Sequence, residues 1–332
     1  MICLQRILSV LLITLAGISA SAQDASSLIK EGQQLNSAKK YAGAIEKYKS
    51  ALAIDPANPG ANYQLAFTLY LSGKGAEGIP YLDKSIKGST SPQLTAGSYS
   101  LMGSIYGSNK QLPQAIEAYK NGIKADSTNQ RIYYNLGIVY YRSKLYTEAE
   151  QSFIQALQLD NNYTDSQRMY ALAAFHENKR AEALLGFSRF LLLEPNSGRS
   201  AEAFGNLQSI LQGGALTPEQ GYRPTAIARG LANQQNQVVG KALLGFAAKR
   251  YASKNVLLTA QLKAVFTAIA MDTKNSYPFA DYFNKLAQTE HLSTFAYIIS
   301  QKAYPESVKW VGENAEKVAG LDAWVKANKP SF

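Results

Sequence analysis

The chain has 332 residues, with 34 Lys and Arg against 24 Asp and Glu, which gives a formal net charge of +10. It contains one cysteine and two histidines, so an internal disulfide and a cysteine-rich metal site are excluded, and few zinc ligands remain. The length allows two domains, and the positive charge favours either an anionic partner or a well-solvated surface.

The first 22 residues are typical of a secretory signal peptide. Arg6 precedes an apolar run, Ile7–Ile18, and the small residues Ala20-Ser21-Ala22 follow it as a cleavage site would. The run is shorter than the roughly 20 apolar residues that span a membrane. We therefore expect an exported chain that starts at Gln23, in the periplasm or outside the cell, with no membrane span after processing.

Small residues recur at almost one interval through residues 23–211. The members of this series are Gly32, Ala66, Gly103, Gly137, Ala171 and Gly205, spaced by 34 residues except for one interval of 37. A second series lies twelve positions later, and each member precedes a bulky side chain by four: Ala44, Gly78, Ala115, Ala149 and Ala183. A fixed period of this length predicts stacked antiparallel helix pairs, each of which buries its apolar face against its neighbours.

Within one period the spacing is helical. In the fourth, Tyr133, Leu136, Gly137 and Tyr140 share one face of a first helix, and a second helix follows with Ala149, Phe153 and Ala156. This pattern resembles the tetratricopeptide repeat, although Asn161 stands where proline is usual. The resemblance covers five units and implies an all-α solenoid with a closing helix. In the second of these repeats, we expect Pro80 to shorten the second helix.

The resemblance implies a scaffold that binds a protein or peptide in the groove formed by the inner faces of the first helices. At the corresponding positions, and beside them, the chain carries aromatic rings with a few polar and basic groups: Tyr63, Phe67, Tyr70, Tyr134, Asn135, Ile138, Tyr141, Arg142, Arg168 and Phe175. Small residues, Ser100 and Ser104, lie between them. Members of the family that grip a terminal carboxylate use lysine, arginine and asparagine here, so we do not expect a carboxylate clamp. Rings in this pattern would suit an extended peptide or a glycan; alternatively, the C-terminal helices fill the groove.

The period ends after Gly205, and glycines and prolines in residues 212–224 indicate a linker. Helical patterns continue through residues 225–332, where we expect a helical C-terminal domain that includes a buried helix over Val256–Met271. The segment Ser276–Phe332 resembles the tails of uncharacterised exported repeat proteins.

Residues Gln220–Met271 contain basic side chains and no acid. The members of this basic region are Arg223, Arg229, Lys241, Lys249, Arg250, Lys254 and Lys263. Such a region can bind an anionic polymer, either a glycan or lipid headgroups, which is the alternative to peptide binding. Export makes nucleic acid an unsuitable partner. Simple solvation of helix faces would explain the same charges.

No motif for catalysis is present. The chain lacks G-x-S-x-G and H-E-x-x-H, and its histidines, His176 and His291, are far apart in sequence. Pairs of carboxylates that act together cannot be recognised from sequence, because the partners need not be neighbours in the chain. We expect a non-enzymatic scaffold in the cell envelope, with no cofactor and no metal.

Overall fold

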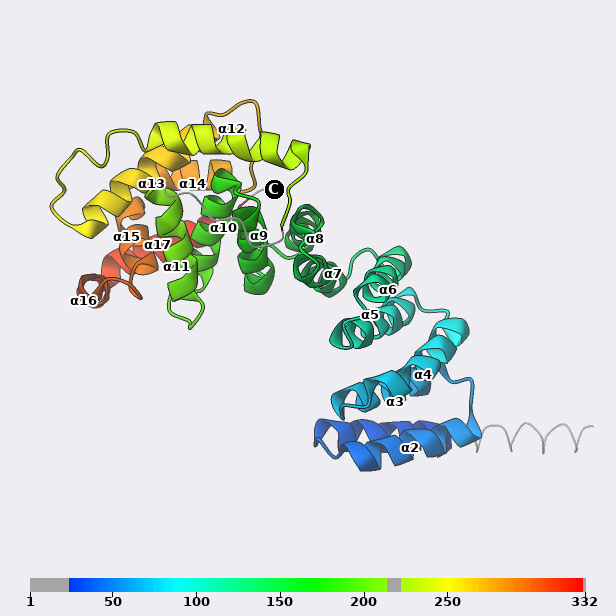
Figure 1. Ribbon diagram of the computed structural model, residues 1–332. Coiled ribbons are helices and arrows are strands. Elements are labelled where there is room, and N and C mark those ends of the chain that lie inside the picture. The colour runs from blue at the N-terminus through cyan, green and yellow to red at the C-terminus, as the bar shows by residue number, and fades with distance from the viewer. Residues whose placement is uncertain (1–23, 214–221, 331–332) are drawn as a thin grey trace, which may run out of the picture. The chain divides into compact units, whose positions relative to one another are not determined.

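The structure is a computed structural model that describes residues 24–213 and 222–330. Every regular element within these residues is a helix (Figure 1). The predicted all-α helical solenoid is therefore confirmed. The expected signal peptide, residues 1–22, and most of the expected linker lie outside the described residues.

The chain divides into two compact units, residues 1–139 and residues 140–332, and the boundary falls inside α7 (Gln130–Arg142). The first unit contains a helix over residues 24–37, α2 (Tyr41–Ile54), α3 (Pro59–Leu71), α4 (Gly75–Gly88), α5 (Pro92–Ser108) and α6 (Leu112–Ala125). The second unit begins with α8 (Tyr146–Leu159), α9 (Thr164–His176), α10 (Arg180–Leu193) and α11 (Ser200–Leu211). It continues with α12 (Ala226–Ala242), α13 (Lys254–Ala270), α14 (Ala280–Ala287), α15 (His291–Ile299), α16 (Pro305–Glu313) and α17 (Ala315–Ala327).

The small residues of the two series bring paired helices close together. A Cβ atom added to Gly78 of α4 would lie 3.1 Å from the carbonyl oxygen of Ala66 in α3. At Gly103 of α5, an added Cβ would lie 2.8 Å from the ring of Tyr119 in α6. Thus, in the third repeat, the bulky residue that follows the second-series position fills the space beside the small residue of the first helix, as the sequence indicated.

The turn between the two helices of each pair uses one left-handed residue in a fixed register. The φ angles are 59° at Lys39, 81° at Gly73, 60° at Lys110, 59° at Lys144 and 59° at Asn178. Glycine adopts this conformation without steric cost, whereas a residue with a Cβ does not. Three of the five turns therefore place a lysine where glycine would be less strained.

The single interval of 37 residues lengthens one helix. α5 has 17 residues, while α3, α7 and α9 have 13 each. All four helices end five residues beyond their small residue, so the extra turn lies at the start of α5. Pro92 occupies the first turn, where its missing N–H is not needed, and the Ser91 hydroxyl accepts a hydrogen bond from the Leu94 N–H at 3.3 Å.

Pro80 does not shorten its helix, contrary to expectation. α4 has 14 residues, the same length as α2, α6, α8 and α10. The Pro80 ring lies on the exposed face of α4, and Gly78, Leu82 and Ser85 hold the opposite face in the core. Packing of that buried face outweighs the loss of one backbone hydrogen bond.

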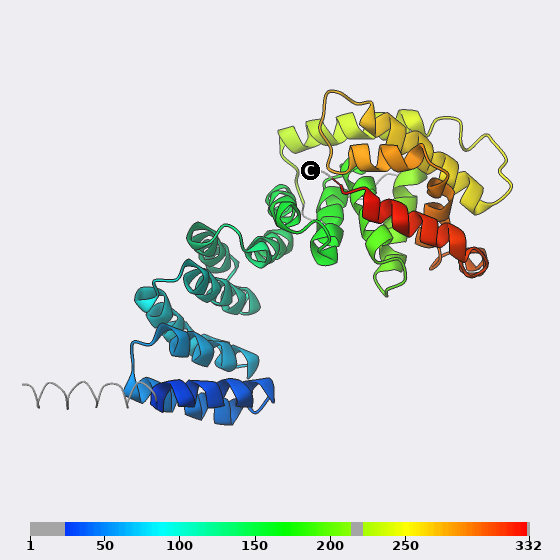
Figure 2. The same ribbon diagram turned by 180° about the vertical axis from the view of Figure 1, so that it is seen from behind.

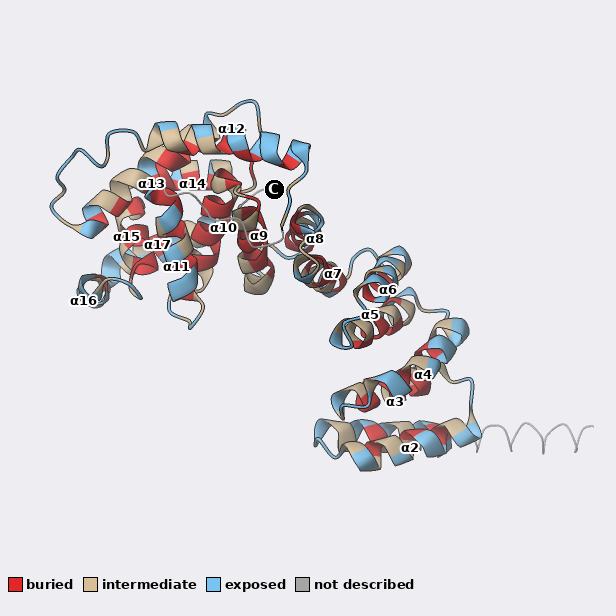
Figure 3. Ribbon diagram, viewed as in Figure 1, coloured by how far each residue is buried: buried red, intermediate tan, exposed pale blue. Residues whose placement is uncertain are grey.

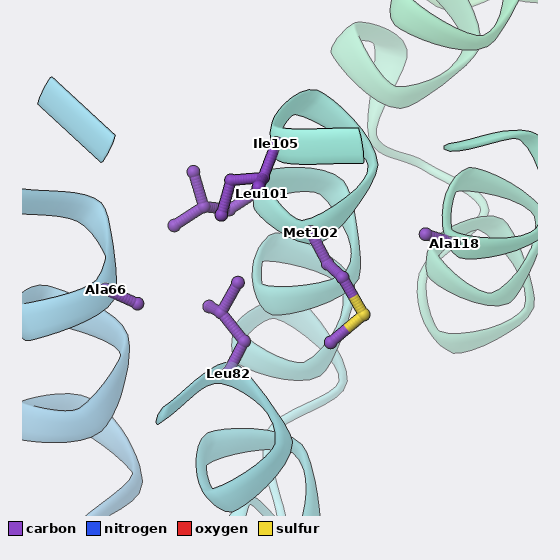
Figure 4. Packing of buried hydrophobic residues seen from close by; sticks show 6 residues of the cluster. All are labelled: Ala66, Leu82, Leu101, Met102, Ile105 and Ala118. Carbon is purple, nitrogen blue, oxygen red and sulfur yellow. The ribbon is translucent and has the colours of Figure 1, made fainter. Parts of the chain in front are cut away.

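The core of the first unit lies between successive pairs. Leu101, Met102 and Ile105 of α5 meet Ala66, Leu82 and Ala118 in one apolar cluster. Figure 4 shows Leu101 on the side of Ala66 and Met102 on the side of Ala118. Because α5 contributes to contacts in both directions, this helix joins the second repeat to the third.

In the second unit, the helices after the linker pack on the last repeats (Figures 1 and 2). α10 contacts both α12 and α15, and α13 packs against α12, α14 and α15. Three buried rings form the centre of the C-terminal helices: the ring centroids of Phe266 and Phe283 are 4.7 Å apart, and Phe295 lies 5.9 Å from Phe283. Arg189 of α10 is almost fully buried, and its guanidinium lies 5.3 Å from the ring centroid of Tyr282 in α14.

α13 differs in one respect from the buried helix that the sequence predicted over Val256–Met271. One face is buried, with Leu262, Val265 and Phe266 in the core, but Val256 is 45% exposed and Met271 is 74% exposed. The helix therefore has one buried face and one that is exposed or partly exposed, rather than burial all round.

Candidate functional site

Three aromatic residues form a stripe along α3. Tyr63, Phe67 and Tyr70 lie at i, i+4 and i+7, so they share one face of the helix. Their rings pack on the core cluster and stay partly exposed, and the rings of Tyr63 and Phe67 are parallel to within 3°, with centroids 6.2 Å apart. Each of these predicted groove residues therefore offers an aromatic edge or face to solvent.

The matching positions of α5 carry only small side chains. They are Ser100, Ser104 and Gly107, and Gly97 lies one turn earlier. The Ser104 hydroxyl donates to the Ser100 carbonyl oxygen at 3.0 Å and lies 3.0 Å from the Tyr119 hydroxyl, so its polar atom is satisfied inside the repeat. We call this set the α5 notch, since nothing larger than a serine projects from that face beside the rings of α3.

Arg131, at the start of α7, places a positive charge near the ring of Tyr63. Burial raises the pKa of the Tyr63 hydroxyl, and the positive charge of Arg131 partly opposes that rise. Arg131 itself is exposed. It was not among the residues predicted from the sequence, which lie at other positions of the first helix. A signal existed, since Arg131 precedes Tyr134 by three and hence shares its face.

The predicted residues of α7 divide between the units. Tyr134, Asn135 and Ile138 are partly buried in the first unit. In the second unit, Arg142 is exposed, while the Tyr141 ring contacts Tyr146, with centroids 5.2 Å apart.

The predicted residues of α9 have partners within the second unit. The Phe175 ring packs edge-on against Phe187 of α10, with centroids 5.8 Å apart. Arg168 donates to Glu202 of α11 at 2.6 Å, one period further along the chain. Its charge is therefore neutralised, and Arg168 is a less available ligand-binding cation than the sequence suggested.

His176 lies in an aromatic stack rather than beside a reactive group. Its ring is parallel to Tyr146 to within 13°, with centroids 4.9 Å apart, and Tyr222 packs edge-on against the same tyrosine. Burial lowers the pKa of His176, although the charge of Glu202 opposes this shift. The histidine is thus largely neutral at neutral pH and serves the packing of the turn after α9.

A cavity of about 660 Å³ lies at the end of the α3 stripe. Its lining includes Tyr70, Leu71, Lys74, Glu77, Ile105 and Asn109. The lining therefore mixes apolar side chains with a lysine, a glutamate and an asparagine. The cavity extends the α3 stripe toward the turn between α3 and α4.

A buried charge cluster surrounds Lys179 in the second unit. Its ammonium lies 2.5 Å from Glu150, 2.6 Å from Glu177 and 3.8 Å from Glu182, and the side chains of Lys179, Glu150 and Glu177 are at most 6% exposed. The Tyr222 hydroxyl donates to Glu177 at 3.0 Å. The fold therefore brings three carboxyl groups together, which no sequence pattern revealed. They surround a buried lysine.

The protons of this cluster are shared unevenly. Burial raises the pKa of Glu150 well above its ordinary value, and the neighbouring charge of Glu182 adds to this rise. Burial would also raise the pKa of Glu177, but the Lys179 ammonium and hydrogen bonds lower it overall. Burial disfavours the charged Lys179, yet the three carboxylates raise its pKa. We infer a charged lysine and an ionised Glu177, with Glu150 as the proton-holding carboxyl.

The basic region remains at the surface. All seven of its predicted members are exposed: Arg223, Arg229, Lys241, Lys249, Arg250, Lys254 and Lys263. Figure 3 shows exposed positions along α12 and in the loop that leads to α13. Lys254 also lies over the Tyr304 ring, 5.1 Å from its centroid.

Among residues 24–213 and 222–330, no group of three or more metal-ligating side chains is arranged to hold a metal ion. In the same residues, no helix combines the length and the apolar character that crossing a bilayer requires.

Three segments of the chain, two of which overlap, match families of repeats. Residues 32–73 and 103–144 match the family described as TPR repeat, and residues 130–163 match the tetratricopeptide repeat. These segments are tetratricopeptide repeats. Such repeats bind protein or peptide partners and act as protein-interaction scaffolds, typically without catalysis.

The known relatives share part of their length with this chain. A TPR repeat-containing protein of Methanocaldococcus jannaschii is 26% identical over 169 residues, which cover 49% of this chain and 30% of that protein. RNA polymerase II-associated protein 3 of Homo sapiens is 32% identical over 122 residues, which cover 37% of this chain and 18% of that protein. The chain thus spans less than a third of either relative.

A solved structure from a functional characterisation of Pseudomonas aeruginosa pilF has a TM-score of 0.51 and 16% identity, and covers 68% of this chain and 95% of that one. At this identity, the likeness shows the fold alone.

Proposed function

We propose that the tetratricopeptide repeats of the first unit bind an extended peptide of a protein partner along α3, α5 and α7. The observation that carries this proposal is the aromatic stripe of α3, which rests on the core and stays partly exposed beside the α5 notch. Rings of this kind give a large contact area with little loss of side-chain entropy.

The surface also suggests the chemistry of the peptide. Tyr63 and Phe67 would pack against apolar or aromatic side chains, and the α5 notch leaves room for the peptide backbone to approach the helix. Arg131 is exposed and its charge reaches Tyr63, so it would pair with an acidic group at one end of the contact. The cavity beside Tyr70 would receive another side chain of the peptide. We therefore propose a peptide that carries apolar residues and at least one acid.

Selection from a phage-displayed library of random peptides tests this proposal, followed by titration of the selected peptides in solution. Tyr63→Ala should weaken binding about tenfold or more, because a central aromatic contact is worth at least about 1.4 kcal/mol. Ser100→Leu should weaken it similarly by filling the α5 notch, without removing any core contact. Tyr41→Ala, on the outer helix α2, is the matched aromatic control and should bind as the parent does.

Equal binding by Tyr63→Ala, Ser100→Leu and the parent chain would contradict peptide binding at this surface. Selection of glycans rather than peptides by the same face, measured on an immobilised glycan panel, would also count against the proposal.

We also propose that this binding takes place outside the cytoplasm, in the cell envelope. The support is the apolar run Ile7–Ile18 followed by Ala20-Ser21-Ala22. Sequencing the amino terminus of the chain recovered from a bacterial periplasmic extract should find Gln23. Recovery from the cytoplasm with Met1 in place would oppose it.

A further inference from the structure

The loop between α12 and α13 gathers positive charge at one end of a helix pair. Lys241, Lys249, Arg250 and Lys254 are all exposed, and residues 241–254 contain no acid. We call residues 241–254 the α12–α13 tip. Lys254 of the tip lies over the Tyr304 ring, and the acid whose charge acts on Tyr304 is Glu306 of α16. Glu306 is exposed. The tip and Glu306 together still carry an excess of positive charge, so the tip suits an anionic partner.

The same part of the chain exposes large apolar side chains. Of the described residues, the three most exposed large apolar side chains are Ile227 at 78%, Leu244 at 77% and Met271 at 74%. Leu244 lies inside the α12–α13 tip, between Lys241 and Lys249. Single exposed apolar residues are ordinary on a protein surface. Here, however, an exposed leucine coincides with the acid-free basic segment, which solvation by charge does not explain.

The tip also contains aromatic rings and borders an apolar hollow. The rings of Phe246 and Tyr251 are parallel to within 7°, with centroids 6.1 Å apart. A cavity of about 380 Å³ borders Phe246, and Leu211, Leu243 and Leu257 also line it. Apolar and aromatic groups next to lysines and arginine form the combination that binds at the boundary between lipid headgroups and acyl chains.

We propose that the α12–α13 tip docks on the surface of an anionic lipid bilayer. Lys241, Lys249, Arg250 and Lys254 contact headgroup phosphates, and Leu244 enters the region of the acyl chains. An acidic glycan or protein would use the charges but would leave Leu244 in water. The exposed leucine therefore favours a bilayer over a soluble polyanion.

Vesicle sedimentation tests this proposal with the chain that starts at Gln23, so that the apolar run Ile7–Ile18 cannot itself bind lipid. Vesicles contain phosphatidylcholine alone, or phosphatidylcholine and phosphatidylglycerol in equal parts. We expect binding to the anionic vesicles only, with a steep loss as the salt rises from about 0.05 M to about 0.5 M. Lys249→Glu with Arg250→Glu should weaken binding at least about 25-fold, at about fivefold for each cation lost. Leu244→Ser should weaken it about tenfold.

Matched variants distinguish the tip from net charge and from general apolar exposure. Lys49→Glu with Lys120→Glu makes the same charge change at exposed sites of α2 and α6, and Val308→Ser removes a 54% exposed side chain of α16. Both should bind anionic vesicles as the parent does. Circular dichroism of each variant confirms that it is folded.

Three results would overturn the proposal: equal binding to both kinds of vesicle, equal loss in the tip variants and their controls, or retention on heparin that is insensitive to Leu244→Ser together with no vesicle binding. The last result would identify a soluble anionic polymer as the partner. None of these outcomes bears on peptide binding along α3, because the tip lies in the second unit and α3 in the first.

Discussion

Two glycines of the same helix should respond in opposite ways to alanine. Gly97 and Gly103 both lie inside α5, so each costs about 1 kcal/mol in helix propensity relative to alanine. At Gly97, an added Cβ would lie 3.7 Å from the Tyr63 ring, which is ordinary contact. At Gly103, it would lie 2.8 Å from the ring of Tyr119, a side chain only 3% exposed.

These contacts determine the expected change in the free energy of unfolding for each variant. Gly97→Ala should raise the free energy of unfolding by about 0.5–1 kcal/mol, since the gain in propensity meets no clash. Gly103→Ala gains the same propensity but loses about 1–3 kcal/mol to overpacking, because Tyr119 is enclosed and its hydroxyl is held 3.0 Å from Ser104. A net loss of up to about 2 kcal/mol follows, and the two variants should differ by the overpacking loss of about 1–3 kcal/mol.

Native-state hydrogen exchange of the amides of α5 and α6 is the appropriate measurement. It reports the local opening free energy of this repeat, which matters because the two compact units need not unfold together. Greater protection in Gly97→Ala and lower protection in Gly103→Ala is the expected result. Equal stabilisation by both substitutions would refute the idea that the small residue exists to admit Tyr119.

Further substitutions test the turns and the buried charges. Lys110→Gly should raise the free energy of unfolding by about 0.5–1 kcal/mol, because it removes a lysine in the left-handed conformation. Gly73→Ala, at the equivalent turn, should lower the free energy of unfolding by about the same amount. The urea midpoint measures both changes, and shifts of the same sign would argue against strain in the turn. Lys179→Met should lower the free energy of unfolding by about 3–5 kcal/mol, because the ionised Glu177 loses its buried cation; a loss below about 1 kcal/mol in urea unfolding would show that the cluster is not held by the lysine. The pKa of Glu150 is raised in the folded chain well above its ordinary value, so its ionisation costs stability at high pH and that cost is relieved as the pH falls. Glu150→Gln should therefore be most favourable relative to the parent near about pH 8 and lose this advantage toward about pH 5; a difference that does not change with pH would contradict the raised pKa.

The sequence was enough to predict the repeat and its internal packing. Gly103 and Tyr119 lie in different helices, yet their fixed offset in the repeat predicts that they pack side by side, as they do. Such prediction works because each unit contacts mainly its neighbours, so a one-dimensional period carries three-dimensional information. The place of the extra turn was harder to predict, since an insertion of three residues can lengthen either a loop or a helix.

Contacts outside the period could not be predicted in this way. The cluster around Lys179 joins residues of α8 and the turn after α9 to Tyr222, and no local spacing relates them. Arg168 was predicted to bind a ligand, but it pairs with Glu202. The 34-residue offset between the two residues would have revealed this pair. Pro80 was misjudged because its cost depends on which face of the helix is buried, and tertiary packing decides that.

The extra turn of α5 makes the third repeat unlike the others as a building block. Four added residues extend the helix by about 6 Å at its amino end. Units of 34 residues can be duplicated or exchanged with one another while their edges continue to match, whereas a copy of the third repeat would bring a longer first helix into a stack of shorter ones. The third repeat, whose first helix forms the α5 notch, is therefore the one least interchangeable with the others in length.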